Sequence, residues 1–202
     1  MGRPWVSEAG NLYATLALRD PAPPECLATL SLAAAVAVRR ALVNLTSAPE
    51  RLALKWPNDV LLDARKASGL LLEGRGGGLV LVGCGVNCAH HPPNTTYGAT
   101  DFAAAGLVVE PAALSRRLKD EMTNALSRWN RGSGFSDIRK EWLSAAYGMG
   151  RPATIMRADG PLEGIAQSID MEGRLLLDVN GRTVAIAAGD MVPARAGRVG
   201  NG

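Results

Sequence analysis

Lys55-Trp56-Pro57-Asn58-Asp59-Val60 opens the stretch that decides the fold, which continues as LLDARKASGLLLE over residues 61–73. It places two lysines, two aspartates and an asparagine around a proline-fixed turn, between apolar runs. Polar groups of this kind are costly to order unless they hold one another or a ligand. The stretch therefore predicts short strands joined by a turn whose polar side chains form a binding or catalytic site.

Lys66 is the first candidate site residue, because it lies where a polar loop enters an apolar strand. A lysine there can direct its ammonium into a cleft as a point charge for a carboxylate or phosphate. Gly69 allows a ligand or backbone to approach closely. The alternative for Lys66 is a solvated lysine at a strand end. Asn58 and Asp59 either hydrogen-bond their own turn, or Asp59 orients Lys66 or helps to hold Mg²⁺.

The rest of the pattern predicts one large and one small domain. Strands are predicted at residues 11–18, 51–55, 60–62, 68–73 and 79–82, and helices at about residues 25–44, 111–129 and 137–147. After Gly148, short strands follow over residues 153–156, 162–169, 175–179 and 183–187. Asn180-Gly181 between two of them is a strong hairpin signal. We expect a first domain over residues 1–148, a small β-barrel over 149–193 and a tail over 194–202.

The composition indicates a soluble globular protein, with 47% hydrophobic and 20% charged residues. A net charge of +3 fits binding of anionic small molecules and is too weak to indicate nucleic acid. The most apolar stretch, residues 27–45, is interrupted by Arg39-Arg40 and indicates a buried helix rather than a membrane span. Three cysteines without a secretory signal predict a cytoplasmic location.

A second polar element, Gly83-Cys84-Gly85-Val86-Asn87, follows the strand at residues 79–82. Its glycines let a ligand lie against the main chain, and Asn87 offers a donor and an acceptor. The alternative to a ligand site is a structural role, in which the glycines form a tight turn at the end of the strand and Asn87 caps that turn. The metal-like cluster in the sequence is Cys84, Cys88, His90 and His91. Because Cys84 lies in an apolar strand exit, we expect packing there and no zinc.

The segment Lys55–Asp59, with Lys66 ahead of a Gly-Leu-Leu-Leu strand, resembles the signature of the biotin protein ligases. Near the N-terminus, Gly2-Arg3-Pro4-Trp5 and the later Gly10-Asn11-Leu12-Tyr13 are similar to that family's glycine- and arginine-rich loop and the element after it. The resemblance covers residues 2–192. It implies an α+β fold, in which a class II synthetase-like catalytic domain with a mixed sheet flanked by helices precedes an SH3-like barrel.

The resemblance also implies a reaction. In this family the biotin carboxylate attacks the α-phosphate of ATP, with Mg²⁺ as the counter-ion, to give biotinyl-5′-adenylate and release pyrophosphate. The amine of a lysine on a biotin carboxyl carrier domain then attacks the biotinyl carbonyl, which forms the amide and releases AMP. Positioning and charge neutralisation suffice for such chemistry, and Lys66 and Arg3 would be catalytic. The positions that would contact biotin or its adenylate are Lys66, Gly69, Leu70, Gly85 and Trp5, and those that would contact the nucleotide are Asn58, Asp59, Asn87 and Arg3.

The sequence departs from the family pattern at its front. It starts inside the glycine- and arginine-rich loop, so we expect the front of the catalytic domain and a DNA-binding helix-turn-helix to be missing. We expect neither nucleic acid nor a membrane as a partner. A homodimer is one alternative, and the sequence leaves the oligomeric state open. Two alternatives are a lipoate ligase, which shares the fold, and a non-catalytic or incomplete relative that binds biotin, adenylate or the carrier domain. The Lys-Trp-Pro-Asn-Asp context favours biotin.

Overall fold

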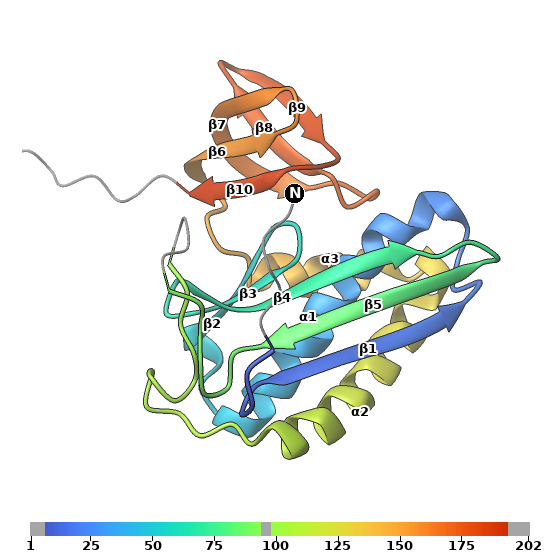
Figure 1. Ribbon diagram of the computed structural model, residues 1–202. Helices are drawn as coiled ribbons and strands as arrows, with labels where there is room; N and C mark the ends of the chain where they lie inside the picture. Colours follow the sequence, from blue (N-terminus) through green and yellow to red (C-terminus); the bar gives the residue numbers. More distant parts are fainter. Residues whose placement is uncertain (1–6, 94–97, 194–202) are drawn as a thin grey trace, which may run out of the picture.

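Two β-sheets and three helices make up the part of the chain that the computed structural model describes, residues 7–93 and 98–193 (Figure 1). The larger sheet has the order β1-β5-β4-β3-β2. Its strands are β1 (Leu12–Arg19), β2 (Leu52–Lys55), β3 (Asp59–Leu62), β4 (Arg65–Gly74) and β5 (Leu79–Val86). Alternate residues of β1 and β5 are more deeply buried, as in strands that turn one face to a core.

The named strands of this sheet pair antiparallel throughout the described residues, so the prediction of a mixed sheet was wrong in this detail. The reason is connectivity, because β2, β3, β4 and β5 follow one another through short turns, which return the next strand antiparallel. In the described part, parallel pairing is limited to the isolated bridges Leu54–Ala146 and Lys66–Ala99. The α+β class itself is confirmed.

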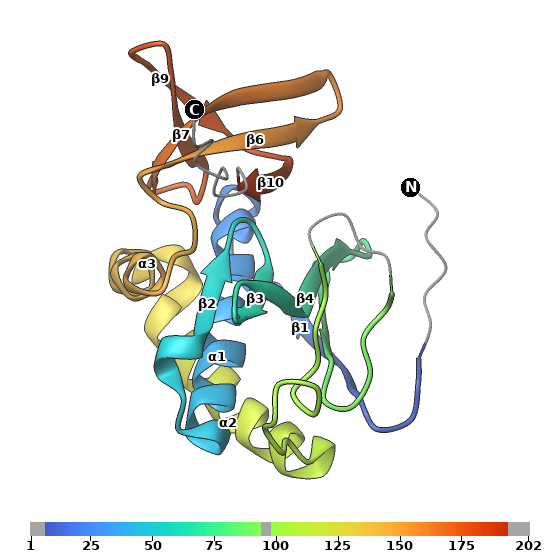
Figure 2. The same ribbon diagram turned by 90° about the vertical axis from the view of Figure 1, so that its left-hand side faces the viewer.

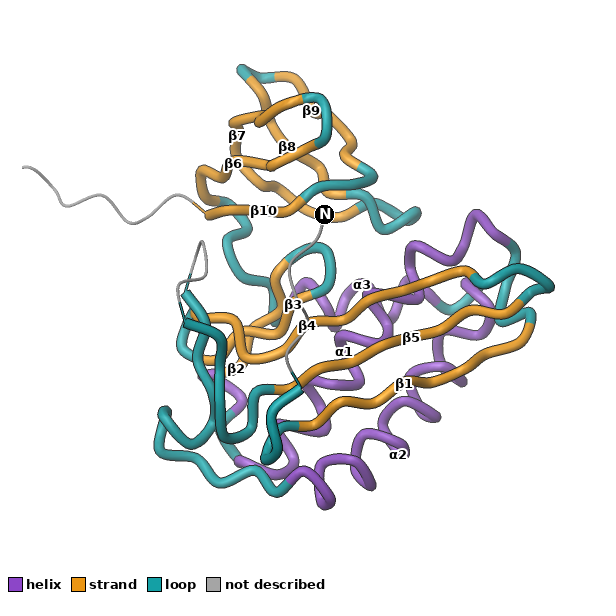
Figure 3. Tube along the Cα trace, in the orientation of Figure 1, coloured by secondary structure: helices purple, strands orange, loops and turns teal. Residues whose placement is uncertain are grey.

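One face of this sheet is covered by α1 (Leu27–Thr46), α2 (Pro111–Trp129) and α3 (Phe135–Ser144), as Figures 2 and 3 show. Short 3₁₀ turns lie at Pro24–Cys26, Pro49–Arg51 and Asn130–Gly132. By length and composition, Pro24–Thr46 is apolar enough to cross a membrane, yet 61% of its most apolar window is buried inside the protein. Alanine-rich α1 therefore packs as a core helix, as predicted.

Glu141 on α3 connects the three helices. Its carboxylate accepts hydrogen bonds from Arg40 Nη2 of α1 at 2.8 Å and from Arg128 Nη1 of α2 at 2.7 Å. Burial alone raises the pKa of Glu141, but the bonds from both arginines outweigh burial and hold the pKa below its ordinary value of 4.5. The ionised carboxylate therefore stabilises the helical layer.

The hydrogen bonds from the two arginines to Glu141 make the free energy of unfolding depend on pH in a defined direction. A carboxyl group whose pKa is lowered by folding contributes stability above its unfolded pKa and loses it as pH falls through the folded value. We expect Glu141→Gln to reduce the free energy of unfolding by about 1.5–3 kcal/mol at neutral pH. The deficit should shrink as pH falls below the ordinary value of 4.5. Urea unfolding of both proteins across pH checks this, and a constant difference would contradict it.

The second sheet has the order β10-β6-β7-β8-β9. Its strands are β6 (Arg151–Arg157), β7 (Gly160–Ile169), β8 (Leu175–Val179), β9 (Arg182–Ile186) and β10 (Asp190–Pro193). Asn180 and Gly181 both have positive φ, as a two-residue hairpin turn of this sequence requires. The short curled sheet is compatible with an SH3-like domain (Figure 1). The domain limits at residues 148, 149 and 193 stay predictions.

Candidate active site

The turn Trp56-Pro57-Asn58 between β2 and β3 brings the two ends of the charged motif together. Lys55 and Asp59 are partners in the β2–β3 register, and Lys55 Nζ lies 3.1 Å from Asp59 Oδ2. Both residues are only 2% exposed. Buried charges are tolerated where they are paired and hydrogen-bonded, so each of these two residues depends on the other.

Lys66 joins this pair from the neighbouring strand β4. Its Nζ lies 2.5 Å from Asp59 Oδ1. The Lys66 side chain is 36% exposed. A buried carboxylate thus holds the ammonium of a side chain that still reaches solvent. A positioned charge of this kind can neutralise the carboxylate or phosphate of a ligand.

Gly69 makes room for this arrangement. It pairs with Asp59 on β3 and with Gly85 on β5. A Cβ at Gly69 would lie 3.1 Å from both Cε and Nζ of Lys66, so any larger residue would press against the ammonium. The two paired glycines also leave adjacent strands without side chains at this point, which suits close approach of a ligand to the main chain.

Three other predicted site residues make contacts that stabilise the local fold. Leu70 is buried in the core, and its backbone N–H donates to Asn58 O at 3.0 Å while its C=O accepts from Asn58 Nδ2 at 2.5 Å. Asn87 Nδ2 donates to Thr100 O at 3.0 Å, and Asn87 O accepts from Phe102 N at 3.0 Å. These bonds explain why the residues are placed as they are. Their roles in binding stay predictions.

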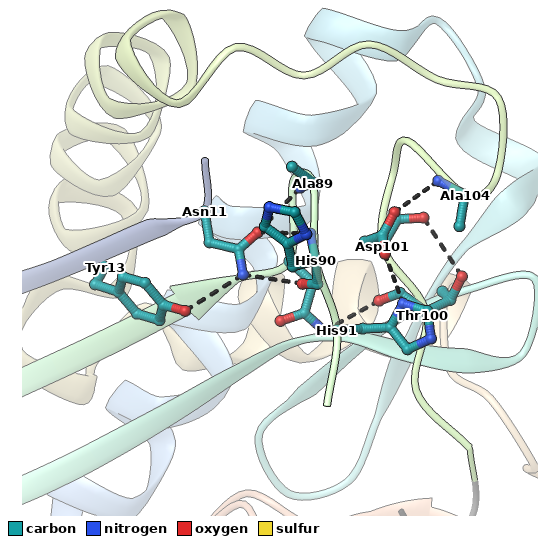
Figure 4. A network of polar contacts seen from close by, with 9 residues as sticks. Asn11, Tyr13, Ala89, His90, His91, Thr100, Asp101 and Ala104 are labelled. Atoms are coloured by element: carbon teal, nitrogen blue, oxygen red, sulfur yellow. Dashed lines mark hydrogen bonds and ion pairs between the residues drawn. The ribbon is translucent and has the colours of Figure 1, made fainter. Parts of the chain in front are cut away.

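The segment of residues 98–101 lies beside β4 and contributes polar residues that could not be recognised from the sequence. Lys66 O accepts a hydrogen bond from Thr100 N at 2.9 Å. The next residue, Asp101, is 4% exposed and lies 2.5 Å from His91 Nδ1 (Figure 4). Asp101 Oδ1 also accepts from Ala104 N at 2.6 Å. The sequence gives no local signal for this pair, because it forms only when the segment folds back.

The metal-like cluster of the sequence is divided among separate contacts. Asn11 Oδ1 accepts hydrogen bonds from Ala89 N at 3.0 Å and His90 N at 3.1 Å (Figure 4). Burial raises the pKa of Cys84 to about 12 and of Cys88 to about 11, so both thiols are protonated at neutral pH. Within residues 7–93 and 98–193, no group of three His, Cys, Asp or Glu side chains is placed to hold a metal. The expectation of no zinc stays a prediction.

Asp59 does not fit the alternative role of a Mg²⁺ ligand. Its oxygens lie 3.1 Å from Lys55 Nζ and 2.5 Å from Lys66 Nζ. Mg²⁺ takes six oxygen ligands at close to ideal octahedral geometry, and an ion at Asp59 would meet two ammonium charges instead. The arrangement supports the other role that the sequence suggests for Asp59, which is to orient Lys66.

The motif also contacts the second sheet. Lys55 Nζ lies 2.8 Å from Asp190 Oδ1 and donates to Met191 O at 3.1 Å. Trp56 is 1% exposed, and its Nε1 donates to Gly173 O at 3.1 Å. Lys55 and Trp56 therefore hold the two sheets together at the turn that carries Asp59. Asp190 carries no local signal of this contact in the sequence, because its partner lies 135 positions earlier in the chain.

A cavity of about 340 Å³ lies on the helix side of the same turn. Its wall is mainly apolar and includes Leu32 of α1, Trp56 and Leu72 of β4. Neither Asp59 nor Lys66 is part of this wall. The cluster around Lys66 offers a positioned charge and this apolar wall does not, so we assign the neutralisation of an anionic ligand to the cluster.

Comparison with known proteins agrees with the resemblance. Residues 1–87 match the Biotin/lipoate A/B protein ligase family. Residues 149–192 match the Biotin protein ligase C terminal domain. The first match includes Arg3 and Trp5, two predicted site residues that lie outside the described residues.

Relatives extend the match over most of the chain. The biotin--[acetyl-CoA-carboxylase] ligase of Paracoccus denitrificans is 37% identical over 189 residues, which are 87% of this chain and 77% of that protein. The ligase of the same name from Mycobacterium tuberculosis is 31% identical over 199 residues, 96% of this chain and 74% of that protein.

A solved structure shares the fold. It is the biotin protein ligase from Aquifex aeolicus in complex with biotin and ATP, with a TM-score of 0.83 and 24% identity, covering 96% of this chain and 83% of that chain. The antiparallel sheet and the C-terminal β-sheet thus share the α+β fold of that structure, and the two relatives above define the class of protein as a ligase. The chain belongs to the biotin/lipoate protein ligase family.

Proposed function

We propose that this chain is an ATP-dependent ligase that attaches biotin to a lysine of a biotin carboxyl carrier domain through biotinyl-5′-adenylate. The observation that carries the proposal is the ammonium of the partly exposed Lys66 side chain, which lies 2.5 Å from the buried Asp59 carboxylate and beside Gly69. Relatives 37% and 31% identical are named biotin--[acetyl-CoA-carboxylase] ligases, which supports it. The match of residues 149–192 favours biotin over lipoate.

Lys66 acts in this proposal as a fixed positive charge. Attack of a carboxylate on a phosphate brings two anionic groups together, and an ammonium already placed between them lowers the barrier. Asp59 keeps the ammonium in place before substrates bind, and Lys55 holds the other oxygen of Asp59. By resemblance, Arg3 adds a second positive charge. Mg²⁺ enters only as the counter-ion of ATP, with no ligand assigned on this chain.

Biotin-dependent exchange of pyrophosphate into ATP tests the proposal. The assay isolates the first half-reaction and needs no carrier protein. We expect exchange that requires biotin and that lipoate does not support. Exchange with lipoate instead would indicate a lipoate ligase. A folded chain that binds biotin without any exchange would be a non-catalytic or incomplete relative.

The remaining parts of the proposal concern the surroundings of the enzyme. We propose a carboxylase carrier domain as the acceptor and a cytoplasmic location. The homodimer and the lack of nucleic-acid or membrane partners stay predictions. Transfer of biotin from preformed biotinyl-5′-adenylate to a purified carrier domain would test the acceptor separately from adenylate formation.

Gly69→Ala tests whether the position of the Lys66 ammonium matters. The added Cβ would lie 3.1 Å from Lys66 Cε and Nζ and would displace them. The ammonium would move by a few tenths of an ångström, and we expect pyrophosphate exchange to fall by up to roughly tenfold, since a full misplacement of about 1 Å costs up to about 10²-fold. Gly74→Ala, on the same strand, is the matched control, because its Cβ would meet nothing within 4 Å. Equal activity of the two variants would reject the role of Gly69.

A further inference from the structure

We propose that Asp190 of the second sheet is a positioning residue for Lys66 and acts through Lys55 and Asp59. The inference rests on the proposed function, because Lys66 is the residue assigned to adenylate formation. The four side chains alternate in charge. Asp190 Oδ1 lies 2.8 Å from Lys55 Nζ, which lies 3.1 Å from Asp59 Oδ2, and Asp59 Oδ1 lies 2.5 Å from Lys66 Nζ.

Because Lys55 and Asp59 are buried, the electrostatic coupling of each to its neighbours is strong. The side chains of Lys55 and Asp59 are 1% and 2% exposed, whereas those of Asp190 and Lys66 are 42% and 36% exposed. Charges coupled inside a protein influence one another more than charges in water. The four side chains therefore form a charged row. It begins at the partly exposed Asp190 on the second sheet, passes through the buried pair Lys55 and Asp59, and ends at the partly exposed Lys66.

Each central group is attracted to the opposite charges on both sides of it in the row. The Lys55 ammonium faces both Asp190 and Asp59, and the Asp59 carboxylate faces both Lys55 and Lys66. Weakening the hold of Asp190 on Lys55 strengthens the pull of Lys55 on Asp59. Asp59 is then held closer to Lys55, and its ion pair with Lys66 becomes weaker. A charge on the second sheet thereby sets the position of an ammonium on the first.

In the proposed adenylation step, Lys55 acts through Asp59 and not by contact with a substrate. Its side chain is 1% exposed, so it cannot touch a ligand while the two sheets are docked. It also donates to Met191 O at 3.1 Å, next to Asp190. These contacts make Lys55 the link between the second sheet and the site, and they predict that the charge of Asp190 is felt at Lys66.

A double-mutant cycle tests the proposal. Asp190→Asn, Lys66→Ala and the double variant are compared in biotin-dependent pyrophosphate exchange. We expect Asp190→Asn to lower the kcat of exchange by roughly tenfold with a smaller change in KM for ATP, and to have no further effect once Lys66 is alanine. Asp190→Glu should restore part of the rate. Additive effects of the two substitutions would overturn the proposal.

Arg139→Gln is the matched control for loss of contact between the sheets. Arg139 of α3 donates to Ile169 O at 2.6 Å and to Ser168 Oγ at 3.1 Å, so it holds the second sheet without touching the charged row. This variant should melt at a lower temperature and exchange pyrophosphate at the wild-type rate. A loss of exchange equal to that of Asp190→Asn would mean that docking alone, and not charge, explains the effect, and would overturn the proposal.

A second readout separates this proposal from the proposed function. Limited acetylation with acetic anhydride, followed by mass spectrometry, reports how firmly the Lys66 amine is held against Asp59. We expect acetylation of Lys66 to be several-fold faster in Asp190→Asn than in the wild type or Arg139→Gln. If the wild type shows no exchange, the proposed function fails while this measurement still decides the coupling. An unchanged acetylation rate in Asp190→Asn would reject the coupling.

Discussion

Lys66→Ala is expected to lower biotin-dependent pyrophosphate exchange by roughly 10²–10³-fold, as removal of a positioned group that stabilises transition-state charge does elsewhere. The fold should survive. The side chain is 36% exposed, and after its removal Asp59 still has Lys55 Nζ at 3.1 Å. The exchange rate, with the melting temperature measured on the same sample, checks both parts of this expectation.

Lys140→Ala is the matched control, because Lys140 is a surface lysine, 76% exposed, that pairs with Asp137 on α3. It should exchange pyrophosphate normally. Lys66→Arg should recover only part of the rate, since a planar guanidinium does not replace a compact ammonium. Near-normal exchange in Lys66→Ala, from a protein that melts like the wild type, would remove Lys66 from the mechanism.

The elements around the site could be predicted where neighbouring residues determine them. The helix expected over residues 111–129 coincides with α2, in which the buried residues recur at helical spacing. The strand expected over residues 175–179 coincides with β8, and Asn180-Gly181 forms its turn. These signals need no knowledge of the partner segment, which is why sequence alone reaches them.

Features that depend on distant partners could not be predicted. Gly83 and Gly85 suggest a strand exit, because glycine weakens a strand. Both nevertheless stay in β5, since β1 and β4 pair with it on either side. In the same way, a lysine in a Lys-Trp-Pro-Asn-Asp motif gives no indication that Asp190 will meet it from 135 positions away. Which charged residues meet in a cluster is determined by the fold and not by the residues next to them in the sequence.

Asp59→Ala is expected to have the largest effect on stability. The carboxylate is 2% exposed and lies against two ammonium groups, one of them the 1% exposed Lys55. Breaking a buried pair by removing one partner leaves an uncompensated buried charge, which costs about 3–5 kcal/mol. Because Asp190 stays 2.8 Å from Lys55, we expect about 3 kcal/mol, at the lower end of that range. Urea unfolding with an unchanged m-value measures it.

Asp63→Asn provides the matched control for Asp59→Ala. Asp63 pairs with Arg51 at 2.5 Å, but its side chain is 47% exposed, and exposed pairs contribute about 0–1 kcal/mol. Replacing both members of the buried pair, as Lys55→Met with Asp59→Leu, should recover part of the lost stability, because no buried charge is left unpaired. If Asp59→Ala destabilises no more than Asp63→Asn, the cluster is not the buried electrostatic unit described, and Asp59 cannot be what holds Lys66 in place.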